Sequence, residues 1–396
     1  MRHFLSIPAV RLLRWCLVLL LPACTDPYLP DVIKDPPSYL VVDGFLNSKG
    51  VSTIKLTRTY AIGSTAAAPT ESKATVYLEE EAGPRTQLRE APLGTYTSPT
   101  ALALNPAKRY RLHLNTFAGQ EYASDFVPVK NTPPIDDLNW RAGGDGASIY
   151  VNTHDATNAT QYYRWDYVET WEITPVYRPT VEYAGGAIIR QITVPYPNLC
   201  WGTAPSTIVQ IEKTTALTQD VVKDFRLRVL PQNSERLYTR YSMLVNQYAL
   251  TKAEYAYWEL LRKNTESIGS LFDPQPVQLT GNVHCLSTPT ALALGFVSAH
   301  SVESRRLFIN RQELPTAWRV LTGYEDCMPP DSVFFDRPPP PMSPKPSEVI
   351  PAIFGSGQVL PIEPIYGNSG VRGYVVKVRD CVDCRRRGTS VKPSFW

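Results

Sequence analysis

The sequence predicts a mainly β protein: an N-terminal Ig-like antiparallel sandwich followed by a second β-rich domain with one or two short helices. Apolar and polar residues alternate with a period of two over many short stretches, which is typical of half-buried strands. The 396-residue chain also contains 36 prolines, which disfavour long helices. Turn signals such as Gly83-Pro84 and Asn105-Pro106 separate the strand-like stretches.

Residues 1–23 have the pattern of a cleaved signal peptide. Arg2, Arg11 and Arg14 make the start positive, and the apolar run 12–21 is shorter than the roughly 20 residues that span a bilayer. Leu21-Pro22-Ala23-Cys24 resembles the lipobox of bacterial lipoproteins, in which the cysteine is lipidated and becomes the first mature residue. The alternative is an ordinary signal peptide with a chance cysteine. We expect a lipid anchor on Cys24 and a Pro-rich tether over residues 24–38.

The mature chain is expected to be formally neutral. The whole sequence has 40 Lys and Arg against 37 Asp and Glu, and the signal peptide removes three arginines and no acid, which leaves 37 of each sign. Nucleic-acid binding needs a strong basic surplus, so we expect no nucleic-acid partner.

Residues 39–130 are expected to form the Ig-like β-sandwich domain. Period-two alternation predicts strands over 39–46, 53–59, 74–79 and 108–115, with a further strand over 121–127. About 90 residues with this spacing of strands and turns fit such a sandwich. The proline-rich stretch 128–134 is the expected boundary.

Residues 135–314 are expected to form the second β-rich domain, with strands over 147–152, 161–172, 188–194, 208–211, 225–230 and 291–299. Tyr163, Trp165, Tyr167 and Trp171 share one face of a strand. They are either a stacking surface for a flat ligand or, the interpretation we favour, part of the sheet core. Both interpretations stay open on the sequence alone.

One helix is predicted over residues 251–266. Thr251 and Glu254 have the spacing of a capping box, and apolar residues follow at helical intervals. Gly269 is suited to close the helix in a left-handed conformation.

Residues 315–396 are expected to be a Pro-rich, Cys-containing C-terminal segment with a polyproline-like excursion around 338–341. Asp331-Ser332-Val333 resembles an O-glycosylation site of bacterial envelope proteins, which makes Ser332 a candidate for modification.

Five cysteines remain after Cys16 leaves with the signal peptide and Cys24 takes the lipid. Outside the cytoplasm pairing is the default, so we expect disulfides among Cys200, Cys327, Cys381 and Cys384, with the connectivity open. Cys285 is the candidate free thiol. The pair Cys381 and Cys384 has the spacing of a redox motif or of half a zinc site, but no second such pair and no suitably placed pair of histidines completes a zinc site, so no metal and no cofactor is expected.

Common enzyme signatures are absent from the sequence. It contains no HExxH, GxSxG, P-loop or GxGxxG pattern. The mature chain keeps His113, His154, His284 and His300, so a nucleophile and a base that meet only in space stay open as an alternative.

The chain resembles the lipoproteins catalogued as domain of unknown function 4249. The resemblance is carried by Tyr241-Ser242-Met243-Leu244-Val245, Tyr257-Trp258, the stretch GSLFDPQP from Gly269 to Pro276, Gly281-Asn282-Val283, Asp383-Cys384-Arg385 and Lys392-Pro393-Ser394-Phe395-Trp396.

That resemblance implies a Bacteroidota envelope protein of the type encoded beside a TonB-dependent outer-membrane receptor. We therefore expect a non-enzymatic binding or gating accessory of such a receptor in nutrient uptake, anchored in the outer membrane. A structural or assembly lipoprotein and an unrecognised hydrolase are the alternatives. The single acid just after Cys24 leaves the face of the membrane undecided.

Overall fold

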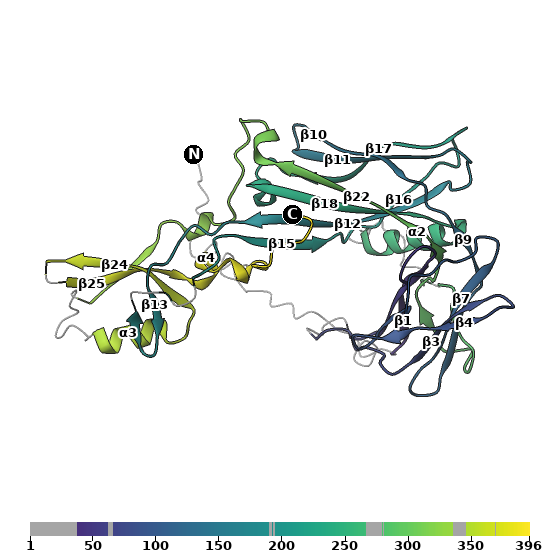
Figure 1. Ribbon diagram of the computed structural model, residues 1–396, viewed down its shortest axis with the longest axis horizontal. Coiled ribbons are helices and arrows are strands. Elements are labelled where there is room, and N and C mark those ends of the chain that lie inside the picture. The colour runs from purple at the N-terminus through teal and green to yellow at the C-terminus, as the bar shows by residue number, and fades with distance from the viewer. Residues whose placement is uncertain are drawn as a thin grey trace, which may run out of the picture.

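The computed structural model describes residues 38–396 apart from 62–65, 190–191, 193–194, 267–278, 280, 336–345 and 369. Within these residues the chain is mainly β, which confirms the predicted fold class. It forms a first lobe, a second lobe and a projecting arm (Figure 1). Cys24, the whole GSLFDPQP motif with the predicted helix-closing Gly269, and the proline run at 338–341 lie outside the described residues.

The first lobe joins strands from two distant stretches of the chain, 40–130 and 283–300, in one 12-stranded sheet of the described residues. Its buried core takes leucines and tyrosines from the alternating strands predicted above. The strands are β1 (Leu40–Asn47), β2 (Thr53–Arg58), β3 (Thr75–Glu80), β4 (Arg85–Gln87), β5 (Arg89–Glu90), β6 (Thr95–Thr97), β7 (Arg109–Asn115), β8 (Glu121–Ser124), β9 (Val127–Lys130), β19 (Val283–Cys285), β20 (Ala293–Leu294) and β21 (Ala299–His300).

Three of these strands come from a part of the chain that we expected in the second domain. β19 pairs with β8, β20 pairs with β1, and β21 lies between β9 and β1, parallel to both. Within residues 39–130, the strands around β7 and β9 therefore do not pair with the strands around β1 and β2. β21 is the strand that joins these two groups. The finer prediction of an Ig-like sandwich stays a prediction, because these added strands alter the expected connectivity.

The second lobe is two stacked sheets (Figure 1). One sheet has the order β10-β11-β17, and the other has β15-β12-β18-β22 with β16 beside β12. Their facing side chains form a shared core. The strands are β10 (Ile135–Ala142), β11 (Ala147–Asp155), β12 (Tyr162–Ile173), β15 (Cys200–Pro205), β16 (Gln210–Lys213), β17 (Asp220–Leu230), β18 (Arg240–Ala249) and β22 (Val302–Asn310), with short helices η2 (Glu235–Leu237) and η3 (Arg311–Glu313).

Helix α2 (Lys252–Glu266) follows β18 and lies at the end of the second lobe that faces the first lobe (Figure 1). Its bounds match the helix predicted from the sequence. None of the described helices is long and apolar enough to cross a membrane.

The arm consists mainly of the Pro-rich, Cys-containing C-terminal segment, which forms regular elements that the sequence did not predict. It contains the sheet β23-β25-β24, the hairpin β13-β14 and helix α3, which share a small core. Pro361 and Pro364 are accommodated because β24 is an edge strand with register shifts. The elements are β13 (Glu182–Ala184), β14 (Ala187–Ile189), η4 (Glu325–Cys327), β23 (Asp331–Phe334), α3 (Pro346–Phe354), β24 (Val359–Gly367), β25 (Gly370–Val378), α4 (Arg379–Val382) and η5 (Cys384–Arg386).

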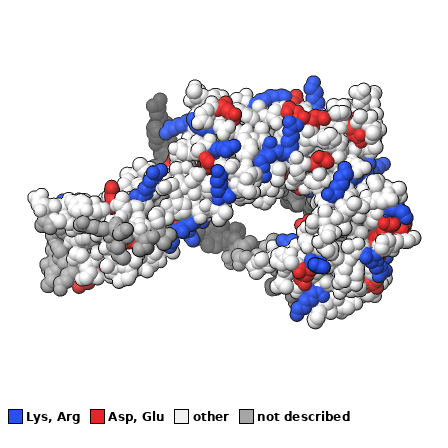
Figure 2. Space-filling view, in the orientation of Figure 1, with Lys and Arg blue, Asp and Glu red and all other residues white. Residues whose placement is uncertain are grey.

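Charges of both signs are interspersed over the face of the two lobes seen in Figure 2. This distribution agrees with the equal numbers of acidic and basic residues in the sequence from residue 24 onward.

Candidate ligand-binding site

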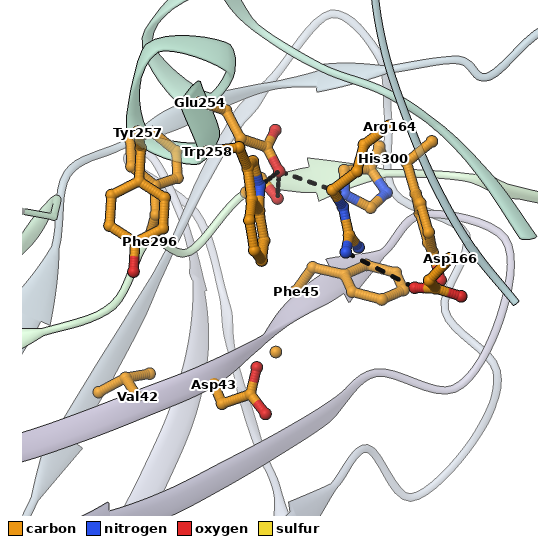
Figure 3. A pocket seen from close by; sticks show the side chains of 13 residues that line it. Val42, Asp43, Phe45, Arg164, Asp166, Glu254, Tyr257, Trp258, Phe296 and His300 are labelled. Atoms are coloured by element: carbon orange, nitrogen blue, oxygen red, sulfur yellow. Dashed lines mark hydrogen bonds and ion pairs between the residues drawn. The ribbon is translucent and has the colours of Figure 1, made fainter. Parts of the chain in front are cut away.

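A pocket of about 220 Å³ lies where the first lobe, the second lobe and α2 meet (Figure 3). Pockets for drug-sized ligands begin at about 300 Å³, so this one suits a smaller molecule. β1, β12, β18, α2 and the segment that ends in β21 contribute the lining residues, which are Val42, Asp43, Gly44, Phe45, Arg164, Asp166, Tyr248, Glu254, Tyr257, Trp258, Phe296, Ser298 and His300.

β1 supplies one side of the pocket, and a glycine shapes it. Gly44 has φ +136°, and a Cβ at this position would lie 2.3 Å from the carbonyl oxygen of Thr53. Only glycine fits both the backbone angle and the close approach. Its neighbour Asp43 is exposed and lies across the pocket from Trp258 (Figure 3).

Helix α2 supplies the opposite side of the pocket. The Thr251 hydroxyl accepts a hydrogen bond from the backbone N–H of Glu254 at 3.1 Å, which is the expected cap. The Glu254 carboxylate turns into the protein, where its Oε1 accepts from Ser298 Oγ at 2.9 Å and from Trp258 Nε1 at 3.5 Å. The helix cap is thus formed by Thr251, while the glutamate is used for the pocket wall.

Arg164 is held between two aromatic rings. Its guanidinium carbon lies 4.2 Å from the ring centroid of Tyr248 and 4.4 Å from that of Trp258. Arg164 Nη1 is 3.6 Å from Asp166 Oδ2. The stacked rings orient the guanidinium, and the neighbouring carboxylate balances its charge.

Glu254 and His300 form a buried polar pair beside the pocket. Glu254 is 3% exposed and His300 is 1% exposed, and His300 Nε2 is 3.8 Å from Glu254 Oε1. Glu254 Oε2 and His300 Nδ1 have no hydrogen-bond partner among the described residues. A buried polar atom left unpaired costs about 1–3 kcal/mol, so the wall holds hydrogen-bonding capacity that the protein itself does not use.

Tyr257 and Phe296 form a third, aromatic side. Their ring centroids are 5.5 Å apart. Burial, together with the negative charge of Asp43, raises the pKa of Tyr257 to about 12. The Tyr257 hydroxyl therefore stays protonated near neutral pH and is able to donate a hydrogen bond.

Among the described lining residues, the one serine hydroxyl is hydrogen-bonded to a carboxylate. The Ser298 hydroxyl donates to Glu254 and not to His300, so no imidazole is placed to take its proton. The described residues also contain no group of three or more His, Cys, Asp or Glu side chains placed to hold a metal ion.

The aromatic strand face is core and not a ligand surface. Tyr163, Trp165 and Tyr167 are at most 3% exposed and pack between the two sheets of the second lobe. The indole N–H of Trp165 donates to Gln247 Oε1 at 2.8 Å. Trp171 is half-buried, and the guanidinium carbon of Arg236 lies 4.4 Å from its ring centroid. The stacking-surface interpretation is therefore wrong for Tyr163, Trp165 and Tyr167, because the opposite sheet covers these rings, whereas Trp171 lines a second pocket beside Glu235 and Arg387.

The four cysteines expected to pair are joined as Cys200–Cys384 and Cys327–Cys381. Cys381 and Cys384 each contribute half of a different disulfide, so both bonds meet at the base of the arm. Cys285 is buried in the first lobe and is the free cysteine of the described chain.

Ser332 lies exposed on β23, next to an ion pair between Lys377 and Asp331 at 3.1 Å. Its glycosylation stays a prediction, as does the lipidation of Cys24.

The charged residues of the pocket were missed by reasoning from the sequence. Alternation along β12 places Arg164 on the face opposite Trp165, which was a usable signal for a residue outside the core. Glu254 was recognised only as a cap and His300 only as one histidine among four. Asp43 carried no local signal at all.

The chain belongs to the family of the domain of unknown function DUF4249, whose model matches residues 25–306. This confirms the family resemblance noted above. Every residue that lines the pocket falls within the matched range, whereas the hairpin β24-β25 of the arm follows it. No curated protein matches the chain.

Proposed function

We propose that this protein is an outer-membrane lipoprotein, lipidated at Cys24, that binds a small solute and acts as a non-enzymatic accessory of a TonB-dependent receptor in nutrient uptake. The observation that carries the binding role is the pocket between the lobes. It combines aromatic walls with charged groups and three buried polar atoms that lack hydrogen-bond partners among the described residues, namely Arg164 Nε, Glu254 Oε2 and His300 Nδ1.

The position of the pocket also supports a gating role. β1 belongs to the first lobe, whereas Arg164 and Trp258 belong to β12 and to α2 of the second lobe. A ligand bound there contacts both lobes at once, so it favours one arrangement of the lobes over others. A receptor that contacts both lobes would sense that change.

The membrane anchor is tested by the substitution Cys24→Ala. We expect the variant to leave the membrane fraction, because a thiol is needed to take the acyl chains that hold the protein on the bilayer. Cys16→Ala, within the signal peptide, is the matched control and should stay membrane-bound. Cell fractionation followed by immunoblotting measures where both variants are found. A Cys24→Ala protein that remains wholly in the membrane fraction would contradict lipidation at Cys24.

The partner is tested by purifying the tagged protein from detergent-solubilised outer membranes of its native host. One TonB-dependent receptor recovered in stoichiometric amount, by mass spectrometry, is the expected result. The same purification with an unrelated tagged lipoprotein is the control and should not recover this receptor. Recovery of several unrelated membrane proteins would instead favour the structural or assembly role.

A further inference from the structure

We infer that the pocket selects an organic cation, namely an ammonium group carried on a small apolar or aromatic body. This inference rests on the proposed role of the pocket as a binding site. It follows from the balance of charge among the groups that line the pocket and from the rings that surround them.

The one arginine of the pocket is already neutralised. Arg164 has Asp166 at 3.6 Å, and both faces of its guanidinium are covered by Tyr248 and Trp258. The guanidinium Nε is buried and has no hydrogen-bond partner among the described residues, but the charge of Arg164 is balanced by Asp166, so the pair has little attraction for an anionic ligand.

Two carboxylates remain without a cation. Asp43 lines the pocket, is exposed, and makes no ion pair or hydrogen bond with another described residue. Glu254 is buried, and among the described residues its charged neighbour is His300, whose Nε2 is 3.8 Å away. The lining of the pocket contains three carboxyl groups, those of Asp43, Asp166 and Glu254, against one guanidinium and one imidazole, and this surplus of acidic groups attracts a cation.

The aromatic lining suits the same ligand. Phe45, Tyr257, Trp258 and Phe296 line the space between the two carboxylates. Aromatic faces attract ammonium and guanidinium groups and also cover apolar carbon. Trp258 already makes such a contact with Arg164, which shows that the rings of this pocket accept a cation.

Three probes of matched size separate charge from shape: 2-phenylethylamine, 2-phenylethanol and phenylacetate. Isothermal titration of each into the purified mature protein at pH 7 measures their affinities. We expect the amine to bind with a Kd of about 1 mM or lower, which is reasonable for a ligand of this size, and at least about tenfold more tightly than the alcohol. Phenylacetate should bind most weakly.

Asp43→Asn tests the residue assigned to the ammonium group. This change keeps the size of the side chain and removes its charge, so amine affinity should fall about tenfold while affinity for the alcohol stays the same. Asp145→Asn is the control, since Asp145 is 57% exposed and does not line the pocket. The thermal midpoint of each variant verifies that it is folded.

Several outcomes would overturn the assignment. They are tighter binding of phenylacetate, equal binding of all three probes, no binding of the amine at about 10 mM, or unchanged amine affinity in Asp43→Asn. Failure here with a receptor still recovered would reject the ligand class and leave the proposed function standing. If the protein selects the amine but no receptor is recovered with it, the ligand class is supported and the partnership with a receptor is rejected.

Discussion

At the scale of single residues, Gly44 shows how the backbone of β1 is adapted to the pocket. Its φ of +136° and the 2.3 Å approach to the carbonyl oxygen of Thr53 leave no room for a side chain. Asp43 and Phe45, on either side, both line the pocket. A change at Gly44 is therefore expected to affect both stability and the shape of the site.

Gly44→Ala should lower the free energy of unfolding by about 2 kcal/mol or more, because it combines backbone strain with a steric clash. Urea denaturation of the mature protein measures this loss. Gly119→Ala is the matched control: Gly119 also has positive φ, +81°, but a Cβ there meets no atom within 4 Å. At that position we expect the free energy of unfolding to fall by about 1 kcal/mol, from backbone strain alone. Equal losses in the two variants would contradict the clash.

The sequence predicted such residues unevenly. Alternation separated the buried rings of β12 from Arg164 on the other face, and the four cysteines of the disulfides were recognised by elimination. The pocket charges come from β1, β12, α2 and β21, and no local pattern indicates that these elements meet. Such sites depend on tertiary contacts that are distant in sequence.

At the scale of elements, α2 is the clearest success of reasoning from the sequence. Its capping residue, its spacing of apolar positions and its length are all local properties, so they can be recognised without the fold. β21 is the opposite case. Two residues, Ala299 and His300, form a strand only because β9 and β1 lie on either side to pair with them.

Thr251→Ala should destabilise the protein by about 1 kcal/mol, because the first turn of α2 loses its capping hydrogen bond. Thr265→Ala, near the other end of α2, serves as the control. The Thr265 hydroxyl donates to the Leu261 carbonyl within the exposed part of the helix, so its removal should change stability by less than about 0.5 kcal/mol. Thermal unfolding of both variants measures the difference, and equal shifts would argue against the cap.

At the scale of the whole molecule, the first lobe is completed by strands from two distant parts of the chain. Its core includes Val283, Val297 and Ala299 beside Leu40 and Leu112. The sequence predicted the early strands well, but it assigned the later segment to the second domain. Alternation reveals that a strand exists and does not reveal which sheet it joins.

A fragment of residues 38–131 should therefore fail to fold by itself. β21 lies between β9 and β1 and hydrogen-bonds to both. Without it, the fragment has no strand pairing between β9 and β1, and each of these strands exposes an unpaired edge. The same fragment joined through a flexible linker to residues 281–301 should fold. Amide NMR spectra and thermal melts distinguish the two, and a dispersed spectrum with a cooperative melt from the short fragment would refute the expectation.

The late arrival of β21 has a consequence for folding after export. β9 ends at Lys130 and β21 ends at His300, so 170 further residues must follow β9 before the first lobe can close. A protein exported with a signal peptide, as proposed above, folds after it has crossed the membrane. Until residue 300 has crossed, the chain holds an incomplete lobe with open strand edges, which are sites for aggregation or for chaperone binding. The pocket and the first lobe are therefore completed by the same step, after α2 has crossed.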